Sequence, residues 1–321
     1  MKVIEANHVY KVFGRRPSDG VKKLKAGRTR DQLRKSGQTA AVIDTSFDVD
    51  KGEIFVVMGL SGSGKSTLIR MVNGLLPITA GSMTLYGEDL AHVSKSKLRE
   101  LRRERVSMVF QNFALLPHRT VGENAAYGLE IQGVNRSERE RRATEALALV
   151  GLKGWGGYKP GELSGGMRQR VGLARALAAE TDILLMDEAF SALDPLIRRE
   201  MQDQLIDLQG KLGKTILFIT HDLNEAMRLG DRIAMMRDGR VEQVGTAEEI
   251  LRDPASDYVS RFVADVDRTR VLTAGSIAEP PYAILGSDRS PRAAHKLLRE
   301  NQPSWLLVQN RDRTPFGYVW E

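Results

Sequence analysis

The fold is decided by the stretch Gly59-Leu60-Ser61-Gly62-Ser63-Gly64-Lys65-Ser66-Thr67. The apolar run Glu53–Met58 precedes it and an amphipathic segment, Ser66–Asn73, follows it, which predicts a strand, a glycine-rich loop and a helix in succession. Glycines let successive backbone N–H groups turn inward onto phosphate oxygens, and the helix start adds partial positive charge. The stretch therefore predicts a phosphate-binding loop. Lys65 is expected to reach the β- and γ-phosphates, and the Ser66 hydroxyl to coordinate Mg²⁺.

A second apolar run, Ile183–Met186, ends in two acidic residues, Asp187 and Glu188. Four apolar residues bury the predicted strand and bring Asp187 to its carboxyl end, toward the metal. Glu188 is then placed to polarise the attacking water as a general base. By itself, an apolar run that ends in two acids is as often a strand that meets solvent. Together with the phosphate loop, it predicts the second half of a nucleotide site.

The segment Leu163–Arg170 (LSGGMRQR) begins a predicted helix with Ser164, Gly165 and Gly166. A hydroxyl and free N–H groups at a helix start form a second anion site. One nucleotide does not need two such sites on one subunit, so this site is predicted to bind the γ-phosphate of ATP held by a neighbouring subunit. The alternative is an ordinary helix cap at Ser164.

Two further polar residues end apolar strands. Gln111 follows the strand predicted over Val106–Phe110, and His221 follows Thr215–Thr220. Taken alone, each is more typical of a capping or surface side chain than of a catalytic one.

The composition is that of an ordinary globular protein, with 41% apolar and 28% charged residues in 321, enough for two domains. No apolar run approaches the about 20 residues that span a bilayer, and the start lacks the apolar core of a signal peptide. If the chain works at a membrane, we expect it at the cytoplasmic side with help from other proteins. The absence of cysteine excludes disulfides, thiolate catalysis and cysteine-ligated metals.

The net charge of +7 is concentrated in one segment between Gly14 and Thr39. This segment contains nine basic residues and only two acidic ones, Asp19 and Asp31. The nine are Arg15, Arg16, Lys22, Lys23, Lys25, Arg28, Arg30, Arg34 and Lys35. One interpretation is a solvated insertion kept soluble by its charge; the other is a segment near anionic lipid headgroups or an acidic partner. Nucleic-acid binding is not expected, because no recognition motif or interleaved aromatic residues accompany the charge.

Strands alternating with helices predict a mainly parallel sheet covered on both faces, with ligands at the carboxyl ends of the strands. The predicted domains are a nucleotide-binding domain over 1–265 and a linker with a regulatory segment over 266–321. The first contains a basic insertion (14–40) and a mostly helical part (about 88–165). The second begins with charged 267–270 and proline-rich 278–281. A strand, a helix and two strands then follow, over Tyr282–Ile284, Pro291–Glu300, Ser304–Gln309 and Gly317–Trp320.

The order of these motifs resembles the nucleotide-binding subunit of an ABC transporter over residues 3 to about 265. The phosphate loop is followed by Gln111, LSGGMRQR, LLMDE, Ser191–Asp194 and His221. The resemblance implies a P-loop NTPase cassette of the α/β class, with a RecA-like mixed sheet core and a helical subdomain. It also implies hydrolysis of Mg-ATP between two copies of the chain.

The resemblance implies further roles, residue by residue. Phe13 would stack on adenine, with Tyr10 also nearby. Gln111 would touch Mg²⁺ and the water and couple to the permease, and His221 would hold the γ-phosphate. Ser164 and Gly166 would bind ATP across the dimer, and Asp194 would link the two sites.

A closer resemblance is to the bacterial glycine betaine/proline/choline importers, carried by Phe113–Val121, Met186–Arg198 and Asp222–Arg228. That group also has a basic insertion and a C-terminal tandem of CBS regulatory modules. Residues from about 276 resemble the first part of a CBS module, and the sequence ends at Glu321 before such a module closes. The implied partners are transmembrane permease subunits and, indirectly, an extracytoplasmic solute-binding protein. The implied location is peripheral, on the cytoplasmic face of the inner membrane.

Three alternatives remain open. The first is a mechanical ATPase of the same superfamily acting on DNA or ribosomes, although those typically carry two cassettes or a long coiled-coil insertion. The second is an importer subunit for another small solute. The third is a nucleotide-binding module without turnover, which the presence of both Glu188 and His221 disfavours.

The stretch Phe113–Tyr127 is predicted to meet the permease. We expect it to expose Phe113, Leu115, Leu116 and Tyr127, since unburied apolar side chains typically mark a partner surface. The alternative is a local core beneath a loop.

Overall fold

The computed structural model describes residues 1–111, 113–191, 193–264, 266, 271, 283–301 and 305–320, with the side chains of 300 and 301 left out. The chain divides into two compact units, Met1–Val271 and Leu272–Glu321, which are considered separately. The predicted charged stretch 267–270 and the proline-rich stretch 278–281 lie outside the described residues. In the described part, no helix is both long and apolar enough to cross a membrane.

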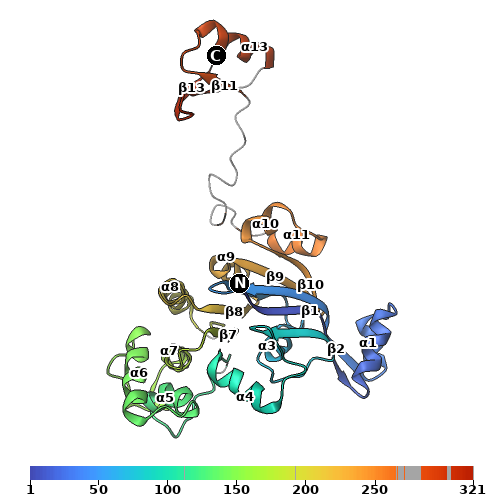
Figure 1. Cartoon of the computed structure of the whole chain (residues 1–321), viewed down its shortest axis with the longest axis vertical. Coiled ribbons are helices and arrows are strands. Elements are labelled where there is room, and N and C mark those ends of the chain that lie inside the picture. Colours follow the sequence, from blue (N-terminus) through green and yellow to red (C-terminus); the bar gives the residue numbers. More distant parts are fainter. Residues whose placement is uncertain are drawn as a thin grey trace. The chain divides into compact units, whose positions relative to one another are not determined.

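A six-stranded sheet forms the centre of the first unit, in the order β10-β9-β3-β8-β7-β6 (Figure 1). Five of its strands are parallel, and β10 pairs antiparallel with β9. Their bounds are β3 Ile54–Met58, β6 Val106–Val109, β7 Ile183–Asp187, β8 Thr215–Thr220, β9 Arg232–Arg237 and β10 Arg240–Gly245. The predicted mixed, mainly parallel sheet is confirmed. The strand predicted over 106–110 ends one residue early, at Val109, and Gln111 lies in the turn beyond it, as predicted.

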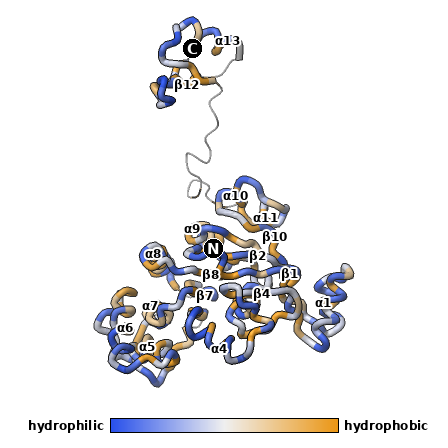
Figure 2. Tube along the Cα trace, in the orientation of Figure 1, coloured by the Kyte–Doolittle hydropathy of each residue, from blue (hydrophilic) through white to orange (hydrophobic). Residues whose placement is uncertain are grey.

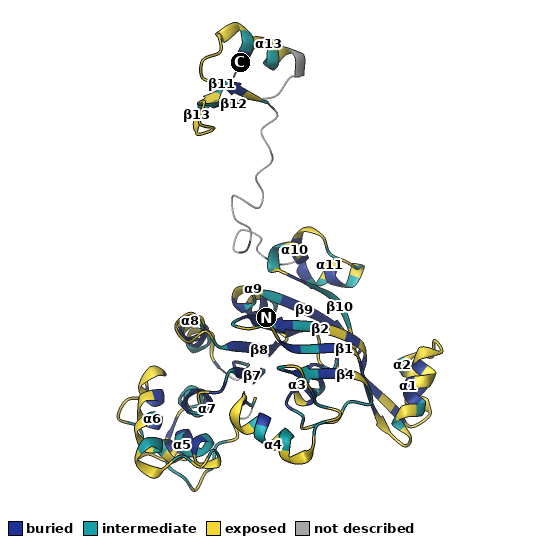
Figure 3. Ribbon diagram, viewed as in Figure 1, coloured by how far each residue is buried: buried dark blue, intermediate teal, exposed yellow. Residues whose placement is uncertain are grey.

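Both faces of the parallel strands are largely buried, as near-continuous apolar strands require, whereas β10 at the edge is mostly of intermediate burial (Figures 2 and 3). On β3, Val56 and Met58 face one core, while Phe55 and Val57 face another. The helices that contribute to the first core include α5 Val121–Ile131, α6 Arg136–Leu149, α7 Gly165–Ala178, α8 Pro195–Leu212 and α9 Leu223–Leu229, and the last two helices of this unit add Ile250, Leu251, Val259 and Val263. The second face packs against α3, Lys65–Val72, and against another sheet.

That second sheet is antiparallel and was not predicted. Its order is β2-β1-β4-β5, with β1 Lys2–Gly14, β2 Gln38–Asp50, β4 Ala80–Leu85 and β5 Glu88–Asp89. β1 and β2 alternate in sequence like ordinary strands, but their pairing joins segments separated by the basic insertion. The remaining helices of this unit are α4 Lys95–Glu104, η1 Pro160–Glu162, α10 Ala247–Arg252 and α11 Asp257–Val263.

The basic insertion folds into two helices, α1 Pro17–Lys25 and α2 Arg30–Lys35. Val21, Leu24 and Leu33 are buried against β1 and β2, in a small core with Tyr10 and Ile43. Eight of the nine basic side chains are exposed, and Arg30 is the exception at intermediate burial. The insertion is therefore a packed element with a charged outer surface, a form that both sequence interpretations allow.

The second unit has strands β11 Ile284–Gly286, β12 Leu306–Gln309 and β13 Pro315–Val319 around helix α13, Pro291–Asn301. β11 and β12 are parallel, and β12 and β13 antiparallel. The element order is the predicted one; Tyr282, the start of the first predicted strand, lies outside the described residues. Its likeness to a CBS module stays a prediction.

Candidate active site

The phosphate loop joins β3 to α3, as predicted, and its glycines have a structural reason beyond phosphate binding. A Cβ on Gly59 would lie 2.1 Å from the Met236 carbonyl oxygen, and one on Gly64 would lie 2.3 Å from that of Ala41. Both glycines also have positive φ, 153° for Gly59 and 109° for Gly64. Only glycine allows β9 and β2 to approach the loop this closely.

Lys65 is the most buried charged group of the site, with 4% of its surface exposed. Its Nζ donates hydrogen bonds to the Gly59 carbonyl at 2.7 Å and to the Leu60 carbonyl at 3.1 Å. Burial lowers the pKa of Lys65, and the nearby carboxylates of Glu188 and Asp187 oppose that shift. The loop carbonyls therefore hold the ammonium inside the loop, where a phosphate would meet it.

Asp187 lies at the carboxyl end of β7, beside α3. The Ser66 hydroxyl donates to its Oδ1 at 3.0 Å, and the side chain is 5% exposed. Burial raises the pKa of Asp187, and the hydrogen bond from Ser66 opposes that rise. A hydroxyl and a buried carboxylate side by side are hard oxygen ligands, the kind that Mg²⁺ prefers, so the predicted pair fits this metal. Among the described residues, no cluster of three or more His, Asp or Glu offers another metal site.

The Glu188 side chain lies close to the other predicted catalytic residues. Its Oε2 accepts a hydrogen bond from Gln111 Nε2 at 3.2 Å and lies 3.3 Å from His221 Nδ1. Its Oε1 lies 4.0 Å from Lys65 Nζ. Gln111, Glu188 and His221 follow β6, β7 and β8, so the carboxyl ends of three adjacent strands bring them together.

The Glu188 backbone has φ of +46°, an uncommon conformation for a non-glycine residue. Its N–H donates to the Ile219 carbonyl at 3.0 Å, and its own carbonyl accepts from the Ser191 hydroxyl at 2.9 Å. These two bonds hold the backbone in this conformation, from which the Glu188 carboxylate reaches His221. Strain held this way is found preferentially at functional sites.

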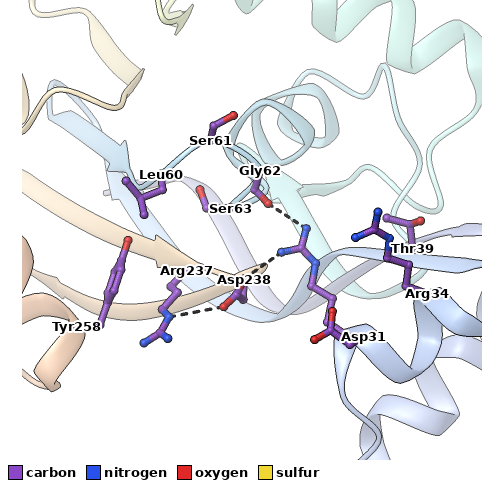
Figure 4. Close-up of a pocket in the computed structure, with 11 residues that line it drawn as sticks. Asp31, Arg34, Thr39, Leu60, Ser61, Gly62, Ser63, Arg237, Asp238 and Tyr258 are labelled. Carbon is purple, nitrogen blue, oxygen red and sulfur yellow. Dashed lines mark hydrogen bonds and ion pairs between the residues drawn. The ribbon is translucent and has the colours of Figure 1, made fainter.

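Ser164 and Asp194 lie together, away from the phosphate loop. Ser164 caps α7 by accepting a hydrogen bond from the Met167 N–H at 3.2 Å, and Asp194 caps α8 by accepting one from Ile197 at 3.1 Å. With Gly165 and Gly166 they line a cavity of about 400 Å³. It shares no residue with the cavity of about 720 Å³ beside the phosphate loop (Figure 4). Within one chain the two predicted anion sites are separate.

Of the two candidate adenine-stacking rings, only Phe13 is available. Tyr10 is 5% exposed and belongs to the core beneath the basic insertion, whereas Phe13 is 38% exposed. Phe13 pairs across β1 and β2 with Thr39, which lines the cavity beside the phosphate loop. The adenine role of Phe13 stays a prediction, as does any role of Thr67 in the first turn of α3.

The predicted exposed surface at 113–127 is wrong in one respect. Phe113, Leu115, Leu116 and Tyr127 are all of intermediate burial, and Leu115 packs against the main core. Phe113 and Ala114 have positive φ, 59° and 46°. Arg175 of α7 donates to both carbonyls, at 2.9 and 2.8 Å. The bend and the contact of Leu115 with the main core accompany this partial burial, which sequence periodicity does not reveal.

Residues that sequence reasoning missed also line the cavity beside the phosphate loop: Arg30, Asp31, Arg34, Arg237, Asp238 and Tyr258. Asp238-Gly239 is a recognisable turn signal, with both residues at positive φ as a tight hairpin requires. No sequence signal pointed to Arg30 or Tyr258.

Comparisons with known proteins agree with this geometry. Residues 42–191 match the sequence family described as ABC transporter. The chain is 53% identical, over 99% of its length and 81% of the relative's, to the glycine betaine/carnitine transport ATP-binding protein GbuA of Listeria monocytogenes. It is 51% identical to the glycine betaine transport ATP-binding protein OpuAA of Bacillus subtilis, over 99% of this chain and 76% of that one. The chain is also 53% identical to the trimethylamine N-oxide transport system ATP-binding protein TmoW of Ruegeria pomeroyi, over 98% of this chain and 91% of that one.

A solved structure gives the same fold. The dimeric post-hydrolysis state of the ATP-binding cassette MJ0796 bound to ADP and Pi aligns with a TM-score of 0.65 and 30% identity, over 76% of this chain and 98% of that chain. The chain therefore belongs to the ABC transporter family, as one of its ATP-binding, ATP-hydrolysing subunits.

Proposed function

We propose that this subunit drives uptake of a compatible solute, such as glycine betaine, proline or choline, through a separate transmembrane permease. The observation that carries the proposal is identity of 51–53% across nearly the whole chain to ATP-binding proteins named for glycine betaine or trimethylamine N-oxide transport. The solutes in those names share a methylated nitrogen. An extracytoplasmic binding protein would deliver the solute to the permease, and this subunit would remain peripheral, on the cytoplasmic face of the membrane.

The proposed chemistry uses the residues that meet at the strand ends. The phosphate loop and Lys65 bind the β- and γ-phosphates, and His221 holds the γ-phosphate. Mg²⁺, when bound through Ser66, Asp187 and Gln111, supplies positive charge to the phosphate oxygens. Glu188 accepts the proton of the attacking water, and its hydrogen bond from Gln111 orients the carboxylate.

The proposed working form is a homodimer in which Ser164–Gly166 of one copy completes the phosphate site of the other. The separation of the two cavities within one chain supports this arrangement, since the two predicted anion sites of one chain share no lining residue. The dimeric ABC cassette that shares this fold supports it as well.

The test is to co-purify the subunit with its permease, reconstitute both in vesicles and measure ATPase activity with candidate solutes and their binding protein. Glycine betaine, proline, choline, carnitine and trimethylamine N-oxide are supplied one at a time, with methionine as the control for another importer class. Stimulation by one or more of these five compatible solutes, and not by methionine, is the expected result. Stimulation only by methionine, or by no solute, would reject the proposal.

A further inference from the structure

The basic insertion meets the phosphate loop through one side chain. Arg30, the first residue of α2, donates from Nη2 to the Gly62 carbonyl at 2.9 Å and from Nη1 to Asp238 Oδ1 at 3.2 Å. Gly62 and Asp238, the two residues that accept these bonds, are labelled in Figure 4, where a further dashed line to Asp238 marks its ion pair with Arg237. One guanidinium therefore joins the insertion, the phosphate loop and the turn between β9 and β10.

The backbone of Arg30 is held in place by the cap and the packing of helix α2. Thr29 caps α2 in a capping box with Gln32, and Leu33 is fully buried against the strands of the second sheet. Arg30 is also the only one of the nine basic residues of the insertion that is not exposed. The guanidinium is thus carried by a packed helix and is not a freely moving surface group.

Two successive loop carbonyls are held on their outer side. Gly62 O accepts from Arg30, and Ser63 O accepts from the Gly239 N–H at 2.9 Å. A peptide unit is planar, so fixing its carbonyl also fixes the N–H on its opposite side. These units carry the N–H groups of Ser63, which donates to the Leu60 carbonyl at 3.1 Å within the loop, and of Gly64. Apart from its chain neighbours, no described residue would lie within 4 Å of a Cβ on Gly62, so the Arg30 bond is what restrains its carbonyl.

We propose that Arg30 is a positioning residue that holds the phosphate loop in its nucleotide-binding shape, which makes the insertion part of the ATP site. The inference rests on the proposed placement of the phosphates in this loop. A loop that is already ordered loses less entropy when ATP binds, so this link should act on ATP affinity and much less on the chemical step. Loss of one charge-assisted hydrogen bond and its anchor should weaken ATP binding about three- to tenfold.

The experiment measures ATP affinity, KM and kcat in the full chain for Arg30→Gln, Arg30→Lys and the matched control Lys35→Gln. Lys35→Gln removes the same charge from an exposed position on the same helix. We expect Arg30→Gln to raise Kd and KM with kcat nearly unchanged, Arg30→Lys to recover part of the affinity, and Lys35→Gln to behave as wild type. Equal effects of Arg30→Gln and Lys35→Gln would overturn the proposal and indicate a general charge effect.

Asp238→Asn removes one anchor of the link without changing α2. It should raise Kd by a smaller factor than Arg30→Gln. The ion pair of Asp238 with Arg237, at 3.5 Å, is exposed and contributes little, so the double variant should be no weaker than Arg30→Gln alone. Additive effects contradict the link. Lys65→Ala separates the two proposals: if it leaves ATP binding intact, the assigned phosphate site itself fails, whatever Arg30 does.

Discussion

At the residue scale, Glu188 and Lys65 lie in one site, but substituting them should have different effects on ATP binding and hydrolysis. Glu188 meets Gln111 and His221 at the strand ends, whereas Lys65 is buried within the phosphate loop. We expect Glu188→Gln to keep ATP binding and to lose about 10²–10⁴-fold in turnover, the usual contribution of a general base. Lys65→Ala should weaken nucleotide binding itself. Equilibrium binding and steady-state ATPase assays distinguish the two, and wild-type turnover in Glu188→Gln would refute the assignment.

The glycines of the loop give a second prediction at this scale. Gly62 and Gly64 both have positive φ, but a Cβ on Gly64 would meet the Ala41 carbonyl at 2.3 Å, while one on Gly62 would meet open space. Gly62→Ala should therefore cost only the backbone strain, about 1–2 kcal/mol. Gly64→Ala should cost clearly more, because β2 must move. Chemical denaturation of both variants measures the difference, and equal losses of stability would argue against the close packing.

At the element scale, α8 and α9 are joined by a buried polar contact. Glu225 of α9 is 5% exposed and accepts a hydrogen bond from Gln202 Nε2 of α8 at 3.0 Å. Burial raises the pKa of Glu225, although hydrogen bonds from Thr220 and Gln202 oppose the shift. The folded chain therefore holds this proton more tightly than the unfolded chain.

The sign of the pH dependence follows from that shift. The stability contribution of Glu225 is complete below the ordinary carboxyl pKa of about 4.3, and it is lost as pH rises through the higher folded value. Glu225→Gln lacks this titration, so the free energy of unfolding of wild type should fall relative to the variant across that window. Urea denaturation between pH 4 and 8 tests this, with Glu140→Gln on exposed α6 as control. A difference in the free energy of unfolding between wild type and Glu225→Gln that does not change with pH would contradict this prediction.

Helix α7 connects two predicted functional segments. Ser164 caps its start, and Arg175 near its end holds the carbonyls of Phe113 and Ala114, just beyond Gln111. Burial lowers the pKa of Arg175. Replacing Arg175 by Met should release this loop, so that solute-stimulated ATPase activity of the reconstituted transporter falls several-fold while ATP binding persists.

The matched control for Arg175→Met is Arg141→Met on α6. In the described part of the chain, Arg141 pairs with two carboxylates on the exposed face of α6, at 2.6 Å from Glu138 and from Glu145. Exposed ion pairs contribute little to stability, so this variant should couple normally. If both variants, or neither, lose stimulation, the loop held by Arg175 is not the coupling element.

At the scale of the whole molecule, the question is how two copies share ATP. Glu188→Gln with Mg-ATP should accumulate a dimer, because nucleotide bound between two copies is hydrolysed too slowly to release them. Light scattering should report twice the monomer mass. Adding Ser164→Arg to Glu188→Gln should block the second anion site and leave a monomer that still binds ATP. A Glu188→Gln chain that stays monomeric at high concentration contradicts the shared site.

The sequence by itself determined the phosphate loop, the Asp187-Glu188 strand end and the parallel core. Each of them depends on consecutive residues whose apolar and polar positions follow a fixed period. It also placed Gln111 and His221 at strand ends, and adjacent parallel strands necessarily bring such ends together. The likeness of the motif order to a known family supplied the rest of the site.

Only the tertiary structure decided which side chains complete that site. Arg30 lies 32 residues from Gly62 and 208 from Asp238 in the chain, yet it bonds to both. No local sequence feature distinguishes Arg30 from the other eight basic residues of the insertion. The packing of Leu33 against the second sheet is what distinguishes it. The bend at Phe113 is likewise held by a contact with Arg175, 62 residues away. Contacts of this kind depend on how distant elements pack, and local sequence pattern carries no record of them.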